Sequence, residues 1–302
     1  MIKEHKINEK TTWFEVIEPT QKEQDELNSR GISPEFIFYA LDPNESARTE
    51  IDYTSGNVLV IYDIVTLNSD AQTEPVAMLL DANNNFYTIA RESTSIISNQ
   101  LFKSTTQLIS KEKVTPIDIF LNTSFALIAE YINAIKNINR KRNVIQKNLK
   151  ENLKVNDITS LMELQTQVIY MIDSLKTDKN AVITLKQFLN KNLNDRQNEF
   201  FDDLLVENTQ AIDMVTQASE VINSINNAYS GLHNQKLDKS LRLLTVVQSI
   251  MAVPTVVTGF YGMNMKLPFA HLGWAWMLTI GISLFIILIE IFILFKNNFF
   301  DK

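Results

Sequence analysis

The apolar and polar residues of this chain follow three patterns, one after another. In residues 1–115, short apolar runs separated by turn residues are typical of strands. The runs that predict strands are Thr11–Ile17, Thr49–Tyr53, Val58–Val65, Val76–Leu80 and Phe86–Ala90. Val58–Val65 is nearly continuously apolar, which indicates a central strand that is covered on both faces.

Two short helices are predicted between the first two strands. Gln21–Asn28 is followed by Gly31, and Ser33-Pro34 supplies an N-cap and a first-turn proline before Glu35–Leu41. Together these elements predict an α/β domain over residues 1–115. No glycine-rich phosphate-binding loop follows any strand, so nucleotide binding is not predicted.

The second pattern is helical and extends over residues 116–242. Thr115-Pro116 is another N-cap with a first-turn proline, and Ile117–Val253 contains no proline and a single glycine. Breaks are expected near Asn156-Asp157 and near Thr177-Asp178, where polar residues precede new apolar periods. The last helix, from about Asn180, is predicted to be a long stalk.

The stalk has one apolar and one polar face. Its apolar residues recur at alternating steps of four and three, which is typical of long helices that pack nearly parallel. These residues are Ala211, Val215, Ala218, Ile222, Ile225, Tyr229 and Leu232. The opposite face carries Gln210, Asp213, Gln217, Glu220, Ser224, Asn227 and Asn234.

The third pattern consists of two long apolar runs. Leu243–Met265 has no charged residue and Trp274–Phe295 contains only Glu290, and each run is long enough to cross a bilayer as a helix of about 20 residues. The short link Lys266–Gly273 predicts a transmembrane hairpin with an outer loop, followed by a tail at residues 296–302. We expect Glu290 to snorkel to the interface or to form a hydrogen bond between subunits.

Basic residues indicate the orientation of the hairpin. Lys236, Lys239 and Arg242 precede the first span and Lys296 follows the second, whereas the link contains a single basic residue. The positive-inside tendency therefore places both termini in the cytosol and the loop outside. The first residues lack the apolar segment of a signal peptide, which agrees with a cytosolic N-terminus. We expect a protein with two spans in the cell membrane.

Charge and cysteine content narrow the possible functions. Residues 1–240 hold 24 basic and 33 acidic residues, a net charge of −9. Such a body repels nucleic acid, so we expect no nucleic-acid partner. The chain has no cysteine, which excludes disulfides and thiolate metal sites. The three histidines share no ligand spacing and no nucleophile–base pair is evident, so an enzyme is not predicted.

A stripe of small and polar residues runs along the first span. Thr245, Gln248, Ala252, Thr255 and Gly259 recur at helical spacing. Such a stripe is costly in lipid unless it faces protein or water. Close packing of small residues against another helix would explain it, and so would a water-filled path. Two spans cannot enclose a pore, so the second explanation requires several copies around an axis.

The motif Tyr261-Gly262-Met263-Asn264 lies where the first span meets the polar link. With two terminal spans, a long helix before them and an acidic α/β body, it resembles the CorA family of magnesium channels. The resemblance implies a funnel-shaped homopentamer with the first span lining the pore and Mg²⁺ as the main cargo. It implies these pore residues, from the outer mouth inward: Asn264 as the selectivity ring, with Gly262 and Met263 shaping its loop, then Thr255, Gln248, a hydrophobic constriction at Leu244 and Leu241, and Asp238.

The resemblance also implies a regulatory metal site. Asp203, beside Asp202, falls where the family often has an acid that binds inhibitory Mg²⁺ between subunits. The bound ion would hold the closed state, and its loss would favour opening. Mg²⁺ is therefore expected both as cargo and as regulatory ligand.

An asparagine ring suits a hydrated divalent cation. Mg²⁺ binds oxygen at ~2.0–2.1 Å and gives up its water reluctantly. The amide oxygens of Asn264 can accept hydrogen bonds from the bound waters without trapping the ion. We expect Gly262 to adopt backbone angles closed to other residues and so to turn Asn264 inward. The alternative role of Asn264 is a helix C-cap.

Two departures from the family and two alternative functions stay open. The outer loop Met265–His271 has no acid to concentrate cations, and Pro254 lies one residue later than in some relatives. The chain could carry another divalent cation, such as Co²⁺, Ni²⁺ or Zn²⁺. It could instead be a membrane-anchored sensor or scaffold without transport.

Overall fold

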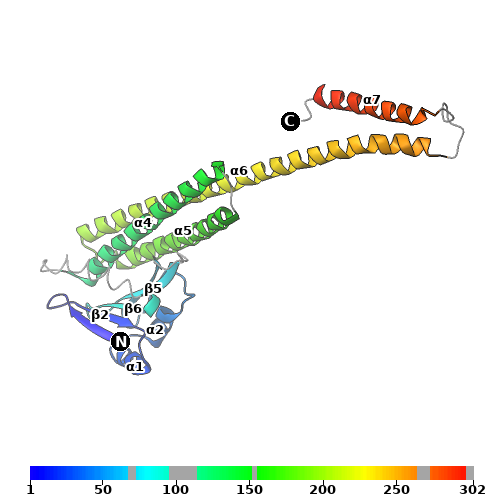
Figure 1. The fold of residues 1–302 in the computed structure, drawn as a ribbon. Helices are drawn as coiled ribbons and strands as arrows, with labels where there is room; N and C mark the ends of the chain where they lie inside the picture. Colours follow the sequence, from blue (N-terminus) through cyan, green and yellow to red (C-terminus); the bar gives the residue numbers. More distant parts are fainter. Residues whose placement is uncertain (67–72, 95–113, 152–154, 264–272, 297–302) are drawn as a thin grey trace. The chain divides into compact units, whose positions relative to one another are not determined.

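The computed structural model describes residues 1–66, 73–94, 114–151, 155–263 and 273–296 (Figure 1). The chain forms two compact units, Met1–Ile225 and Asn226–Lys302. Helix α6 begins in the first unit and continues into the second. The elements are β1 (Ile2–Lys6), β2 (Thr12–Ile17), α1 (Gln21–Ser29), α2 (Pro34–Leu41), β3 (Arg48–Ile51), β4 (Val58–Val65), β5 (Thr73–Leu80), β6 (Phe86–Ala90), the short 3-10 helix η1 (Glu92–Thr94), α4 (Pro116–Glu151), α5 (Val155–Leu189), α6 (Asp195–Tyr261) and α7 (Ala275–Lys296).

The first unit is built on a six-stranded sheet in the order β1-β2-β6-β5-β4-β3. Strands β2 and β6 are parallel, and the other neighbours are antiparallel. All five strands expected from the sequence are present, with shifts of a few residues at their ends. Strand β1 was not predicted, because an edge strand with the sequence IKEHK has little of the apolar alternation by which strands are detected.

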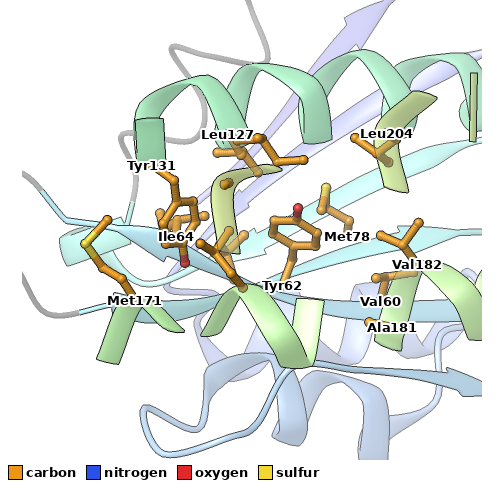
Figure 2. Close-up of a cluster of buried hydrophobic side chains, with 14 of the residues drawn as sticks. Val60, Tyr62, Ile64, Met78, Leu127, Tyr131, Met171, Ala181, Val182 and Leu204 are labelled. Atoms are coloured by element: carbon orange, nitrogen blue, oxygen red, sulfur yellow. The ribbon is translucent and has the colours of Figure 1, made fainter. Parts of the chain in front are cut away.

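Helices cover both faces of the sheet. Alternate residues of β4 enter two different apolar clusters, which confirms that this continuously apolar strand is buried on both sides. Leu59 and Ile61 pack with α1 and α2 on one face. Val60, Tyr62 and Ile64 pack with α4, α5 and α6 on the other (Figure 2).

The helix signals in the first unit act as expected. Ser33 Oγ accepts a hydrogen bond from Glu35 N at 3.2 Å, with Pro34 in the first turn of α2. Gly31, with φ of +92°, ends the segment after α1 in a conformation that favours glycine. At the start of α4, Thr115 Oγ1 lies 2.7 Å from Asp118 Oδ2, so the polar residues before Pro116 are also used at the helix end.

The expected helix break at Thr177-Asp178 is wrong. Helix α5 runs uninterrupted from Val155 to Leu189, so the long helix begins at Asp195 and not near residue 180. The N-cap is Asn194, whose Oδ1 accepts from Gln197 N at 2.9 Å. Asp178 is fully buried, and its Oδ1 accepts a hydrogen bond from Asp63 N of β4 at 2.8 Å. Asp178 is of a residue type typical of helix ends, but here it lies inside α5 and accepts a hydrogen bond from the neighbouring strand β4.

The apolar face predicted on the long helix is confirmed inside the first unit. Ala211, Val215, Ala218, Ile222 and Ile225 are all buried. The predicted polar face is exposed at every one of its seven positions. Leu232, which continues the apolar face into the second unit, is exposed.

Candidate ion pathway

Two helices in the described part of the chain are long and apolar enough to cross a membrane, as judged from length and composition. One is the C-terminal part of α6 and the other is α7. Very little of either apolar stretch is buried within the chain. Large apolar surfaces of this kind are stable when lipid or other protein covers them.

Within the second unit, helix α7 runs beside the last turns of α6 (Figure 1). The less exposed side of α6 in this unit is apolar. Val246 is buried there, and Ile250, Val253, Val257 and Tyr261 are partly buried. On α7, Ser283 is buried and Glu290 is partly buried. The contact between the two spans therefore does not use the small and polar stripe of α6.

That stripe lies on the other side of α6. Thr245, Gln248, Ala252, Thr255 and Gly259 are all exposed. At 100° per residue, Thr255 and Gln248 lie about 180° and 200° around the helix from Val246. Leu244 and Leu241 lie about 160° and 220° from it, so the four residues share one open side. Within one chain the stripe does not pack against α7, so packing against a helix of another copy and a water-filled path both stay open.

Hydroxyl hydrogens on this span are bonded to the helix itself. Thr255 Oγ1 donates to Met251 O at 3.0 Å, and Thr245 Oγ1 donates to Leu241 O at 2.8 Å. Each oxygen keeps lone pairs that can accept a hydrogen bond from outside the helix. Water bound to a cation presents its hydrogens outward, so these threonines match a hydrated ion. Helix α6 continues through Pro254.

The inner residues of the implied path differ in their position around the helix. Leu241 and Leu244 are more than half exposed. Asp238 is exposed as well, but it lies about 90° around the helix from the centre of the side shared by the other four residues. The helix thus places an apolar segment between the polar stripe and this acid.

The end of α6 corrects the argument made for Gly262. The φ of Gly262 is not in the left-handed region. Among the described glycines, only Gly31 and Gly56 have a φ in that region. Gly262 N donates to Thr258 O at 2.9 Å, and a Cβ on Gly262 would lie 3.2 Å from that oxygen. Close approach of the last turn explains the glycine here. Met263 is exposed, and Asn264 lies outside the described residues.

The two acids proposed for regulation are not equivalent. Lys186 Nζ donates to Asp202 Oδ1 at 2.6 Å, and Asp202 lines a groove between α5 and α6. Asp203 is exposed, and no partner is found for it in the part of the chain that the structure describes. No group of three potential metal ligands occurs among the described residues.

A buried polar cluster on the helix-covered face of the sheet was missed by the sequence analysis. Asp178 Oδ2, Tyr62 Oη and both amide atoms of Asn208 are buried without a hydrogen-bond partner among the described residues. Burial raises the pKa of the Asp178 carboxyl well above its usual value, and the charge of Asp63 raises it further. Burial also raises the pKa of Asp63. No spacing rule predicts this pair, because Asp63 and Asp178 are 115 residues apart.

The fold and the two apolar helices define a class: a protein with two membrane spans that follow an α/β unit and a long helix. A family model, CorA-like Mg²⁺ transporter protein, matches residues 8–296, and the chain belongs to this family. A cobalt/magnesium transport protein CorA of Methanocaldococcus jannaschii is 27% identical over 299 residues, which cover 95% of this chain and 90% of that protein. A magnesium transport protein CorA of Helicobacter pylori is 26% identical over 262 residues, covering 84% and 79%.

Solved structures share the fold. The complete CorA structure from M. jannaschii superposes with a TM-score of 0.79 at 23% identity, covering 94% of this chain and 90% of that one. The cytoplasmic domain of ZntB from Vibrio parahaemolyticus superposes with a TM-score of 0.62 at 8% identity, covering 78% and 98%. At these identities the likeness extends to the fold alone.

Proposed function

We propose that the chain forms a homopentameric channel in the cell membrane that carries Mg²⁺ into the cell. The observation that carries this proposal is the open side of α6, where Thr255, Gln248, Leu244 and Leu241 lie opposite the face that meets α7. Polar groups in a span are stable when they face a water-filled path. Copies arranged around an axis would give them such a path.

In this channel the N-terminal unit and both termini are cytosolic, and the link Lys266–Gly273 is external. Asn264 forms the outer ring and accepts hydrogen bonds from the hydrated ion. Thr255 and Gln248 accept further hydrogen bonds along the wall. Leu244 and Leu241 form a ring that excludes water when the pore is closed.

Internal Mg²⁺ regulates the channel at Asp203. Because this side chain is exposed and has no partner within the described residues, its ligand partners come from a neighbouring copy. Bound Mg²⁺ holds the copies together in the closed state, and its loss shifts the population toward the open state.

Ion flux into proteoliposomes tests the proposal. Asn264→Ala removes the amide ring, and we expect Mg²⁺ influx to fall at least tenfold while the protein still assembles. Asn226→Ala, an asparagine change on α6 before the span, is the matched control and should leave influx unchanged. Wild-type influx in Asn264→Ala would refute the ring.

Two alternatives give different outcomes in the same assay. The M. jannaschii relative is named for cobalt as well as magnesium, so Co²⁺ is a second candidate cargo. Competition between Mg²⁺, Co²⁺, Ni²⁺ and Zn²⁺ ranks the ions. A monomer or dimer that supports no flux would favour a membrane-anchored sensor or scaffold.

A further inference from the structure

The last turns of α4 carry a concentrated positive charge that the ion pathway does not use. Residues 136–154 contain seven of the 28 basic residues in the chain and one acid, Glu151, although the whole chain has a net charge of −7. We call the five members of this group whose side chains are described the basic end of α4: Lys136, Arg140, Lys141, Arg142 and Lys147. All are exposed except Arg142, which is partly buried.

Within the described residues, none of these five side chains forms an ion pair. Arg140 and Arg142 reach only the side-chain oxygens of Asn137 and Asn143, at 3.4 and 2.9 Å. Elsewhere in the described part of the first unit, five lysine or arginine side chains pair with acids: Lys3 with Glu15, Arg30 with Glu26, Arg48 with Glu45, Arg91 with Glu74 and Lys186 with Asp202. Like charges spaced one turn apart repel each other, so the basic end is suited to a negative partner from outside the chain.

The basic end lies far from the sheet. Val114 O, just before α4, is tied to the strand region by hydrogen bonds from Asn8 Nδ2 and Thr11 Oγ1. Helix α4 is 36 residues long, which corresponds to about 54 Å. Its far end lies with the start of α5, and Gln165 Nε2 of α5 donates to Asn223 Oδ1 of α6 at 2.8 Å (Figure 1). Two residues later α6 leaves the first unit and continues toward the first span.

One apolar side chain is exposed among these cations. Val144 is 62% exposed, while Ile138 and Ile145 hold the other side of α4 in the core. Basic helices with an exposed apolar residue are typical of segments that lie on anionic membrane surfaces.

We propose that the basic end of α4 binds anionic lipid headgroups of the membrane that holds the two spans. This inference rests on the proposed position of the spans in a bilayer. The spans already hold the chain at the membrane, so the basic end meets the headgroups at a high effective concentration. Its intrinsic affinity for the headgroups can therefore be modest. Each lysine or arginine near an anionic membrane surface raises the binding constant for that surface roughly fivefold. The acidic exposed face of α6 on a second copy, with Asp203, Asp213 and Glu220, is the competing partner.

The lack of cysteine makes a direct test possible. In the full chain, Gln146→Cys places one thiol on the exposed surface of the basic end. After reconstitution, a membrane-impermeant fluorophore labels only the copies whose first unit is outside the vesicle. We expect energy transfer to a headgroup-linked acceptor to be strong in vesicles containing phosphatidylglycerol and weak in pure phosphatidylcholine. Raising the salt concentration should weaken the transfer, because it shortens the range of surface charge interactions.

Substitutions show which charges act. Arg140→Gln with Lys141→Gln and Lys147→Gln should lower headgroup binding on the order of 100-fold, since three contributions are lost. Lys10→Gln with Lys22→Gln and Lys191→Gln removes the same charge from exposed positions elsewhere and should change nothing.

Three results would overturn the inference: equal transfer in neutral and anionic vesicles, unchanged transfer in the basic-end variant, or loss of transfer on neutralising Asp203, Asp213 and Glu220. The last result would identify a second copy as the partner. Mg²⁺ influx in the same vesicles separates this inference from the proposed channel, because influx without lipid-dependent transfer refutes the inference alone.

Discussion

Helix α6 has two halves that reach stability in different ways. In the first unit its apolar residues, such as Leu204 and Val215, are completely buried by the same chain. In the second unit Leu241, Leu244 and Val247 are about half exposed or more, although the helix is continuous. The first half is thus completed by intramolecular packing, whereas the second half needs other molecules around it.

This difference separates what one chain can do alone from what an assembly must supply. The first unit has a sheet with helices on both faces and an apolar core. The second presents an apolar side to α7 and an open side with the polar stripe. Substitutions of buried apolar residues in the first half should therefore change stability, and substitutions on the open side of the second half should change conduction.

A matched pair of leucine substitutions gives the largest expected contrast. Leu204→Ala empties a site with 0% exposure and should lower the free energy of unfolding by about 3 kcal/mol. Leu244→Ala, at 53% exposure, should change that stability by less than ~0.5 kcal/mol but should raise Mg²⁺ leak through the closed channel.

Tryptophan fluorescence can follow the first unit alone. Trp13 is buried there, and the other two tryptophans, Trp274 and Trp276, can be changed to Phe. Denaturant titration of Trp13 fluorescence in the full chain then reports unfolding of the first unit. A comparable loss of stability from both alanine variants would contradict the division of α6 into two halves.

The second prediction concerns the buried acid in the first unit. The raised pKa of Asp178 means that the folded state holds this proton at pH values where the unfolded state has released it. Its contribution to stability is therefore present below the ordinary carboxyl pKa and is lost as pH rises through the raised value. Each unit of pKa difference corresponds to ~1.4 kcal/mol at high pH.

Asp178→Asn should remove this pH dependence. The amide oxygen can still accept from Asp63 N, so we expect the variant to match wild type near pH 4 and to be more stable at pH 8. Denaturant titration followed by Trp13 fluorescence, repeated at several pH values, measures the free energy of unfolding of each variant. Glu163→Gln, an exposed acid on the same helix, is the control and should keep the wild-type pH profile. Parallel profiles for Asp178→Asn and wild type would show that Asp178 titrates normally.

Asp178 also shows which features of this fold cannot be predicted from local sequence signals. Strands β4 and β6 and the start of α2 follow from local signals, namely apolar continuity and capping residues. The Thr177-Asp178 pair carries the same local signal as a true N-cap, and only the contact with β4 decides its role. In the pathway, helical spacing alone predicted that Thr255 and Gln248 share a side. Which side meets α7 depends on packing that the spacing does not contain.

The smallest expected effect separates two neighbouring acids on α6. Asp203→Lys places a cation at the proposed regulatory site and should raise the internal Mg²⁺ concentration needed for half inhibition severalfold. Asp202→Lys breaks the ion pair with Lys186 and should change the Mg²⁺ concentration for half inhibition less, because Asp202 is already paired within its own chain. Flux into vesicles preloaded with graded Mg²⁺ measures both shifts. If Asp202→Lys has the larger effect, the groove between α5 and α6 is the regulatory element and Asp203 is not. If neither variant shifts the inhibition, internal Mg²⁺ acts away from this part of α6, and the first half of the helix serves stability alone.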